Sequence, residues 1–266
     1  MEIAVDNRST FASTGGRPFE LGKPTIVFVH GAGMDRTVWA LQTRYFAHHG
    51  YNAIAVDLPG HGRTEGPPLE SVEALSEWVI TLLDTLEVEA SALVGHSLGS
   101  LVVFDAAARW PGRVKALALI GTSVPMPVAE FLLNAAKNND HDAFDMVTIW
   151  GHSYDGQTGA NQSPGLWMTG GAVRLLERSS PGVLYMSLRA ANNYDDGLER
   201  AHRVTCPTLL LLGHRDAMTP LRAAKPLVEA IPQSRVIKVA GCGHMLMAEQ
   251  PDAVLDGLIP FLRDAF

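Results

Sequence analysis

A serine between two glycines is the residue of this chain best suited to nucleophilic chemistry. The segment Gly95-His96-Ser97-Leu98-Gly99 follows an apolar, strand-like run and precedes a helix-like stretch. A sharp strand-to-helix turn of this kind exposes the serine hydroxyl, and its glycines let neighbouring backbone pack closely. The free amides at the N-terminus of the following helix suit a developing oxyanion. The pattern predicts Ser97 as a nucleophile; a plain turn is the alternative for a single match.

A serine hydroxyl needs a base, and the base needs a carboxylate that orients it. His244 is the candidate base, because it lies in a glycine-rich loop after the last predicted strand. Asp216 is the candidate acid, because it follows the run of leucines that ends at Gly213. The rival acid is Asp57, but the Pro-Gly turn after it favours a role as a loop anchor. We predict a triad of Ser97, Asp216 and His244.

A second glycine-rich turn could bind the oxyanion. The segment His30-Gly31-Ala32-Gly33 directly follows a predicted strand, where glycine lets main-chain amides approach a substrate oxygen closely. We assign the two oxyanion donors to the amides of Ala32 and Leu98, the latter being the residue after the nucleophile. A tight turn after a strand is the alternative for this segment taken alone.

Alternating strands and helices must position these side chains. Buried-strand patterns occur at residues 25–29, 52–56, 91–94, 116–120, 209–212 and 235–239, after short β-prone stretches at 3–6 and 9–14. Helical patterns occur at 72–86, 101–110 and 220–230, and in a final helix that starts at Pro251 and that Pro260 kinks or ends. The alternation predicts an α/β fold, a parallel sheet with helices on both faces.

One region breaks the alternation. Residues 123–204 lack a buried-strand pattern and are too long for an ordinary connection. We predict that they form a helical cap inserted into a core domain of residues 1–122 and 205–266. Apolar side chains over a nucleophile suit an apolar acyl or aryl group. We expect the substrate pocket to be lined by Met126, Trp150, Trp167 and Met168, together with His30, Gly31 and Met245.

With these motifs in place, the chain resembles the α/β-hydrolase superfamily, in particular capped serine hydrolases of the carboxylesterase type. The resemblance rests on the turns around His30, Asp57, Ser97, Asp216 and His244, and it does not extend to the cap. It implies a mostly parallel, eight-stranded sheet with the first two strands antiparallel at one edge. Haloalkane dehalogenases and epoxide hydrolases of the superfamily carry aspartate at the turn, so a serine there argues against both activities.

Composition excludes several other classes of protein. The 266 residues carry a net charge of −7, which argues against a dedicated nucleic-acid binder. Two cysteines form neither a disulfide framework nor a metal-binding pattern. We see no signal peptide, no apolar run of membrane-spanning length and no cofactor motif. We therefore expect a cytoplasmic enzyme with no metal or organic cofactor and no nucleic-acid or membrane partner, either a monomer or a dimer, that acts on a small-molecule ester.

Three functions stay open at this level. The leading one is hydrolysis of small, largely apolar carboxylic esters through an acyl-enzyme on Ser97. The second is cleavage of a carbon–carbon bond in a vinylogous diketone, as in relatives that process aromatic ring-cleavage products. Those relatives often continue the oxyanion turn with Gly-Pro, whereas Met34-Asp35 follows Gly33 here. The third is a ligand sensor on a hydrolase scaffold with slow or no turnover.

Overall fold

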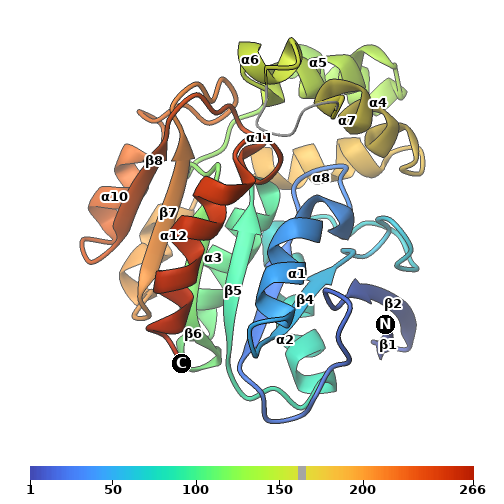
Figure 1. Cartoon of the computed structure of the whole chain (residues 1–266). Helices are drawn as coiled ribbons and strands as arrows, with labels where there is room; N and C mark the ends of the chain where they lie inside the picture. Colours follow the sequence, from blue (N-terminus) through green and yellow to red (C-terminus); the bar gives the residue numbers. More distant parts are fainter. Residues whose placement is uncertain (161–165) are drawn as a thin grey trace.

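A single mostly parallel sheet of eight strands forms the centre of the protein in the computed structural model, which describes residues 1–160 and 166–266 (Figure 1). The strand order is β1-β2-β4-β3-β5-β6-β7-β8. Strand β2 pairs antiparallel with both neighbours at one edge, and all other pairs from β4 to β8 are parallel. The strands are β1 (Glu2–Val5), β2 (Arg8–Ser13), β3 (Thr25–Val29), β4 (Asn52–Val56), β5 (Ser91–His96), β6 (Val114–Ile120), β7 (Thr208–Gly213) and β8 (Arg235–Val239). The predicted fold class is confirmed.

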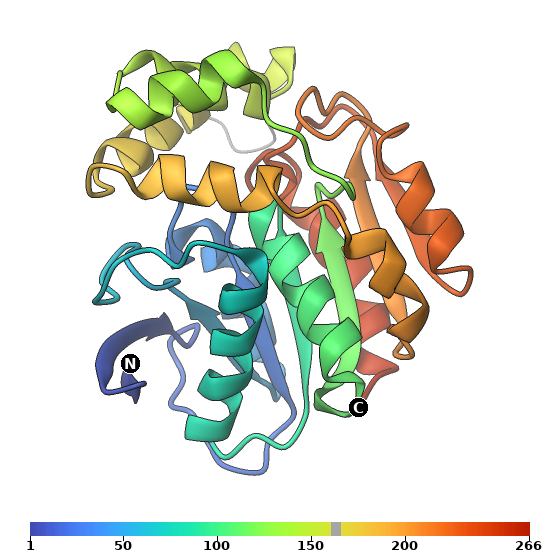
Figure 2. The same cartoon turned by 180° about the vertical axis from the view of Figure 1, so that it is seen from behind.

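Helices cover both faces of the sheet because its central strands are apolar on both sides. In β3, Val27 and Val29 pack into the core under α2 (Val72–Thr85) and α3 (Leu98–Arg109). The alternate residues Ile26 and Phe28 pack on the opposite face under α1 (Ala40–Ala47) and α12 (Pro251–Arg263). This period of two is the alternation expected of strands. Figures 1 and 2 show the two helical layers from opposite sides.

A group of helices separates β6 from β7 in the chain, and we call it the inserted helices. These helices are α4 (Glu130–Asn138), α5 (Asp142–Gly151), α6 (Tyr154–Gln157), α7 (Met168–Glu177), α8 (Val183–Asn192) and α9 (Gly197–Arg200). Figures 1 and 2 show α4 to α8 gathered over one end of the core. The limits of the insertion, 123 and 204, stay a prediction.

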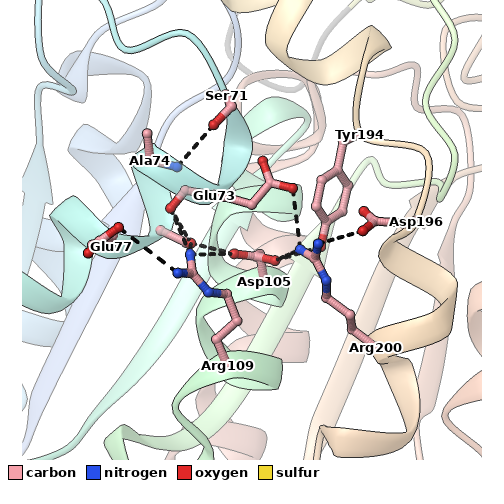
Figure 3. A network of polar contacts seen from close by, with 10 residues as sticks. Ser71, Glu73, Ala74, Glu77, Asp105, Arg109, Tyr194, Asp196 and Arg200 are labelled. Carbon is pink, nitrogen blue, oxygen red and sulfur yellow. Dashed lines mark hydrogen bonds and ion pairs between the residues drawn. The ribbon is translucent and has the colours of Figure 1, made fainter.

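A buried carboxylate fixes the chain where it returns from the inserted helices to the core. Asp105 of α3 accepts hydrogen bonds from Tyr194 Oη at 3.0 Å and from Arg200 at 2.6 Å, both of which follow α8 (Figure 3). On its other side Asp105 accepts from Ser76 of α2 at 2.5 Å and pairs with Arg109 at 3.4 Å. Asp105 is fully buried. The network joins two core helices to the end of the insertion.

The remaining elements correct two expected helix limits. The predicted helix at 220–230 begins only at Lys225, as α10 (Lys225–Ala230), because residues 221–224 form turns and Pro226 suits a first helical turn. Pro260 does not end α12, which continues to Arg263. The other elements are α11 (Leu246–Glu249), η1 (Arg36–Trp39), η2 (Pro111–Arg113) and η3 (Ala201–Arg203). No helix among the described residues has both the length and the apolarity to cross a bilayer.

Candidate active site

Ser97 lies on a tight turn between β5 and α3. Its backbone has φ +52° and ψ −121°, a conformation that costs a non-glycine residue about 1–3 kcal/mol and clusters at functional sites. The glycines on either side allow the turn. A Cβ on Gly95 would lie 2.1 Å from the carbonyl oxygen of Gly99, and one on Gly99 would lie 2.3 Å from that of Val29. The sequence thus folds here into a strained turn that holds a half-buried serine side chain.

His244 and Asp216 meet at the same end of the sheet. Nδ1 of His244 lies 2.8 Å from Oδ2 of Asp216, and both side chains are buried. A carboxylate only accepts hydrogen bonds, so Nδ1 carries the proton and donates it to Asp216. The other ring nitrogen, Nε2, is then the one with a free lone pair. This is the tautomer that a general base requires.

Hydrogen-bond donors to both oxygens of Asp216 stabilise its ionised form. Its Oδ1 accepts from the amides of Met218 and Thr219, each at 2.8 Å. Its Oδ2 accepts from Thr219 Oγ1 at 2.7 Å as well as from His244. Burial alone would raise the pKa of Asp216, but the electrostatic attraction of His244 and the hydrogen bonds from His244 and Thr219 outweigh burial and lower the pKa to about 2. Asp216 therefore stays ionised across the range in which an imidazole titrates.

Nε2 of His244 is a buried polar atom with no hydrogen-bond partner among the described residues. Buried nitrogens are rarely left unpaired, so an orphan one calls for an explanation. His244 and Ser97 line the same cavity. Hydrogen bonds between a base and its nucleophile are often loose without substrate. Ser97 is the candidate nucleophile in this cavity, and the pairing of Nε2 with its hydroxyl stays a prediction.

The two predicted oxyanion donors line that cavity as well. Leu98 is the first residue of α3, where an amide has no partner inside the helix. Within residues 1–160 and 166–266, the amide of Ala32 donates no hydrogen bond to the main chain or to a side chain. Two free amides beside a nucleophile are the arrangement that stabilises an oxyanion in acyl transfer. The donor assignment itself stays a prediction.

The cavity around Ser97 has a volume of about 230 Å³ and an apolar wall. Two of the expected pocket residues, Met126 and Trp150, line it. Its other wall residues are mostly aliphatic. They come from the segment before α4, from the inserted helices and from the turn after Asp216: Pro127, Val128, Ala129, Leu132, Leu188, Ala191, Ala217 and Met218. Among the residues that the structure describes, Thr219 is the one further hydroxyl or charged residue in this lining besides Ser97 and His244.

Three other expected pocket residues lie elsewhere. Trp167, Met168 and Met245 line a second cavity of about 350 Å³ that contains neither Ser97 nor His244. Trp167 is 73% exposed, and its ring folds back over Gly170 of its own helix. The amide of Met245 donates to the carbonyl of Gly151, and Met245 lines the second cavity but not the one that His244 lines. Contrary to the expectation for the substrate pocket, these three residues do not line the cavity around Ser97.

His30 and Gly31 also do not line the cavity around Ser97. His30 is buried beneath the turn, where Nδ1 donates to the Gly31 carbonyl at 2.8 Å and Nε2 accepts from the Leu58 amide at 3.1 Å. A Cβ on Gly31 would lie 3.2 Å from that of Ser97, so the absence of a side chain at Gly31 lets the two turns pack closely together. Both residues therefore support the conformation of the turn that carries the amide of Ala32.

Asp57, the rival acid, is fully buried and makes no hydrogen bond to His244 among the described residues. Its Oδ1 accepts from the Arg36 amide at 2.8 Å, and its Oδ2 accepts from the Arg36 guanidinium at 2.7 Å and the Arg63 amide at 2.9 Å. A Cβ on Gly62 would lie 2.3 Å from Oδ2. Asp57 thus ties two loops together, as its Pro-Gly turn indicated.

Sequence reasoning missed two polar residues beside the histidine. Thr219 donates to Asp216, and its hydroxyl lies 3.2 Å from Nδ1 of His244. Glu249 accepts from the amide of Gly243, the residue before His244. Thr219 lies three residues after Asp216, and Glu249 lies five residues after His244. These spacings were the available signals, but neither residue belongs to a motif that can be recognised in a single sequence.

Three buried histidines near the site make stability depend on pH. Burial lowers the pKa of His30 to about 4 and of His61 and His96 to about 3. Their pKa values in the unfolded chain are about 6.5. Between pH 6 and 5 the unfolded chain therefore binds more protons than the folded protein, and the free energy of unfolding decreases as the pH is lowered. Each of the three protons contributes about 1.4 kcal/mol per pH unit, so the free energy of unfolding should change by about 4 kcal/mol per pH unit in this range.

Urea unfolding at pH 7, 6 and 5 checks this slope. His61→Gln removes one of the three titrating groups and should reduce the slope by about 1.4 kcal/mol per pH unit. An unfolding free energy that stays constant from pH 7 to pH 5 would contradict the neutral, buried state of these rings.

Comparison with known proteins places this geometry in a family. The Alpha/beta hydrolase family profile matches residues 26–256. The chain is 31% identical over 250 residues to the pimeloyl-(acyl-carrier protein) methyl ester esterase of Aromatoleum aromaticum, covering 87% of this chain and 95% of that one. It is 29% identical over 278 residues to a 2-hydroxy-6-oxononadienedioate/2-hydroxy-6-oxononatrienedioate hydrolase of Paraburkholderia phymatum, covering 98% and 93%. The enol-lactonase of Burkholderia xenovorans has the same fold, with a TM-score of 0.88, 21% identity and coverage of 99% and 100%.

Proposed function

The chain belongs to the alpha/beta hydrolase family, and from that premise we propose that it is a serine hydrolase of small, largely apolar carboxylic esters. In this proposal Ser97 attacks the ester carbonyl while Nε2 of His244 accepts its proton. The amides of Ala32 and Leu98 bind the oxyanion of the tetrahedral intermediate. His244 then protonates the departing alcohol, and a water that it activates hydrolyses the acyl-enzyme.

The observation that supports an apolar ester is the wall of the cavity around Ser97. Its volume of about 230 Å³ is below the ~300–1,000 Å³ of pockets for drug-sized ligands, so the acyl group is small. No lysine, arginine, aspartate or glutamate lines it within the described residues. A substrate carboxylate placed there would be desolvated without a partner, which is strongly unfavourable. The chemistry of the wall therefore favours an uncharged acyl chain.

The second candidate is carbon–carbon bond hydrolysis, and the similarity to the Paraburkholderia phymatum hydrolase favours it. The name of that relative describes its substrate as a dicarboxylate. The charge-free wall around Ser97 disfavours such a substrate here. The two functions are separated by comparing kcat/KM for short p-nitrophenyl esters with kcat/KM for a vinylogous diketone acid. We expect turnover of the esters; faster cleavage of the diketone would overturn the ester proposal, and no turnover of either would favour a ligand sensor.

Chain-length selectivity should depend on Trp150. Its indole lines the cavity and packs edge-on against Phe131 at 5.5 Å between ring centroids, so it occupies space that a longer acyl chain needs. Trp150→Ala should move the ratio of kcat/KM values toward longer esters by about 10–200-fold, the range for one apolar contact or its removal. A panel of p-nitrophenyl esters of increasing acyl length measures the ratio.

Trp167→Ala is the matched control for this prediction. It removes the same side chain from the second cavity, where Trp167 is mostly exposed. The control should leave the ester ratio unchanged. An equal change of ratio in both variants, or a uniform loss of activity in Trp150→Ala accompanied by a large fall in Tm, would contradict a role of Trp150 in selectivity.

A further inference from the structure

We propose that Glu249 is a positioning residue for His244, whose carboxylate holds the histidine loop in place and couples it to the inserted helices. The inference rests on the proposed function, because it concerns the same base. Glu249 ends α11, five residues after His244, and its side chain is only 2% exposed. A carboxylate this deeply buried must be fully hydrogen-bonded to be tolerated.

One carboxylate oxygen binds the histidine loop. The amide of Gly243, the residue before His244, donates to Oε1 of Glu249 at 2.9 Å. The approach is so close that a Cβ on Gly243 would lie 2.8 Å from this oxygen and 2.6 Å from the amide nitrogen of Ser153. The backbone next to His244 therefore packs closely against both Glu249 and Ser153, and its position depends on both.

The other carboxylate oxygen binds the inserted helices. The amide of Ser153 donates to Oε2 at 2.9 Å, and the hydroxyl of the same residue donates at 2.5 Å. Ser153 is the N-cap of α6 and follows α5, the helix that carries Trp150. Next to it, the amide of Met245 donates to the carbonyl of Gly151 at 2.9 Å. The segments 151–153 and 243–245 thus lie side by side, with Glu249 bonded to both.

All of these donors are main-chain amides and a hydroxyl. Within the part of the chain that the structure describes, no lysine, arginine or histidine forms an ion pair with Glu249. The carboxylate therefore fixes backbone geometry rather than neutralising a cation. An amide side chain in its place has a single acceptor oxygen and would turn an N–H toward one of the two backbone donors. The histidine loop then has to shift to relieve that contact.

A shift of His244 affects chemistry more than binding. A displacement of about 1 Å at a catalytic group can lower the rate about 10²-fold. The wall of the cavity would keep its apolar side chains, so KM for a short ester should change little. A carboxylate that only stabilises the fold would lower Tm and the fraction of active molecules, and each active molecule would keep its turnover number.

Asp105 provides the matched control. It is likewise a buried carboxylate that bonds the insertion to the core, through Tyr194 and Arg200 (Figure 3). It makes no hydrogen bond to the loop of residues 241–245 among the described residues. Asp105→Asn should therefore lower Tm without changing kcat per active site.

The experiment titrates the active serine of each purified variant with a fluorophosphonate and then measures kcat and KM per titrated site with a short p-nitrophenyl ester. We expect Glu249→Gln to lower kcat per site and the rate of phosphonylation by about 10²-fold with KM nearly unchanged. Ser153→Ala, which removes one of the three donors, should show the same pattern with a smaller fall. Asp105→Asn should match the wild type in all three quantities.

Turnover per site and phosphonylation rate at the wild-type level in Glu249→Gln would overturn the inference, whatever the change in Tm. If Glu249→Gln does not fold, Ser153→Ala decides, and an unchanged kcat per site in that variant overturns it. A wild-type protein that the fluorophosphonate does not label would instead overturn the proposed function, and this inference with it.

Discussion

Ser97→Ala should lower kcat for a short p-nitrophenyl ester by about 10⁶-fold, because members of a catalytic triad act as a unit and the loss of the nucleophile removes covalent catalysis. The variant should fold normally. Alanine keeps the Cβ that serine already carries at φ +52°, so the backbone strain of the turn is unchanged. The hydroxyl removed donates no hydrogen bond within the described residues, so no buried partner loses its bond.

Initial rates together with thermal melting test this result. The residual rate should still exceed that of the uncatalysed reaction by about 10³–10⁴-fold, through the oxyanion donors and substrate binding. A loss smaller than tenfold in a folded Ser97→Ala protein would show that Ser97 is not the nucleophile.

Asp216→Asn should lower kcat by about 10⁴-fold by fixing the wrong tautomer of His244. Two backbone amides, from Met218 and Thr219, donate to Oδ1, so the amide oxygen of Asn should take that position. Its NH₂ group then faces Nδ1 of His244 and donates to it. The ring must carry its proton on Nε2, where it can no longer accept the proton of Ser97.

Asp57→Asn is the control for the choice of acid. Asp57 binds Arg36 and the amide of Arg63, so its replacement should lower Tm and leave kcat of the folded protein unchanged. The opposite result, an active Asp216→Asn and a folded but inactive Asp57→Asn, would assign the carboxylate of the triad to Asp57.

The candidate triad could be predicted because each of its members depends on local sequence. The turn at Ser97 needs Gly95 and Gly99 for close backbone contacts, so its pattern is visible in five residues. Asp216 follows the buried strand β7, and His244 follows β8. The pattern at 235–239 predicted a buried strand, but β8 lies at the edge of the sheet and only Val239 is buried. Parallel strands nevertheless bring their carboxyl ends to one edge of the sheet. Local chemistry and strand direction together place three distant residues near one another.

The pocket could not be predicted in the same way. Trp150 and Trp167 are both large apolar residues of the insertion, yet only Trp150 lines the cavity around Ser97. Which side a helix turns toward the core depends on how the inserted helices pack on one another, and no short motif encodes that packing. Glu249 was missed for a related reason, because its partner Ser153 lies 96 residues away.

The most direct test of the central claim is to find the acyl-enzyme itself. The wild-type protein is quenched in acid during turnover of a short p-nitrophenyl ester, digested and analysed by mass spectrometry. The account predicts one acyl group per chain, on the peptide that contains Ser97. Product release without any acylated peptide, or an acyl group on a different residue, would contradict it.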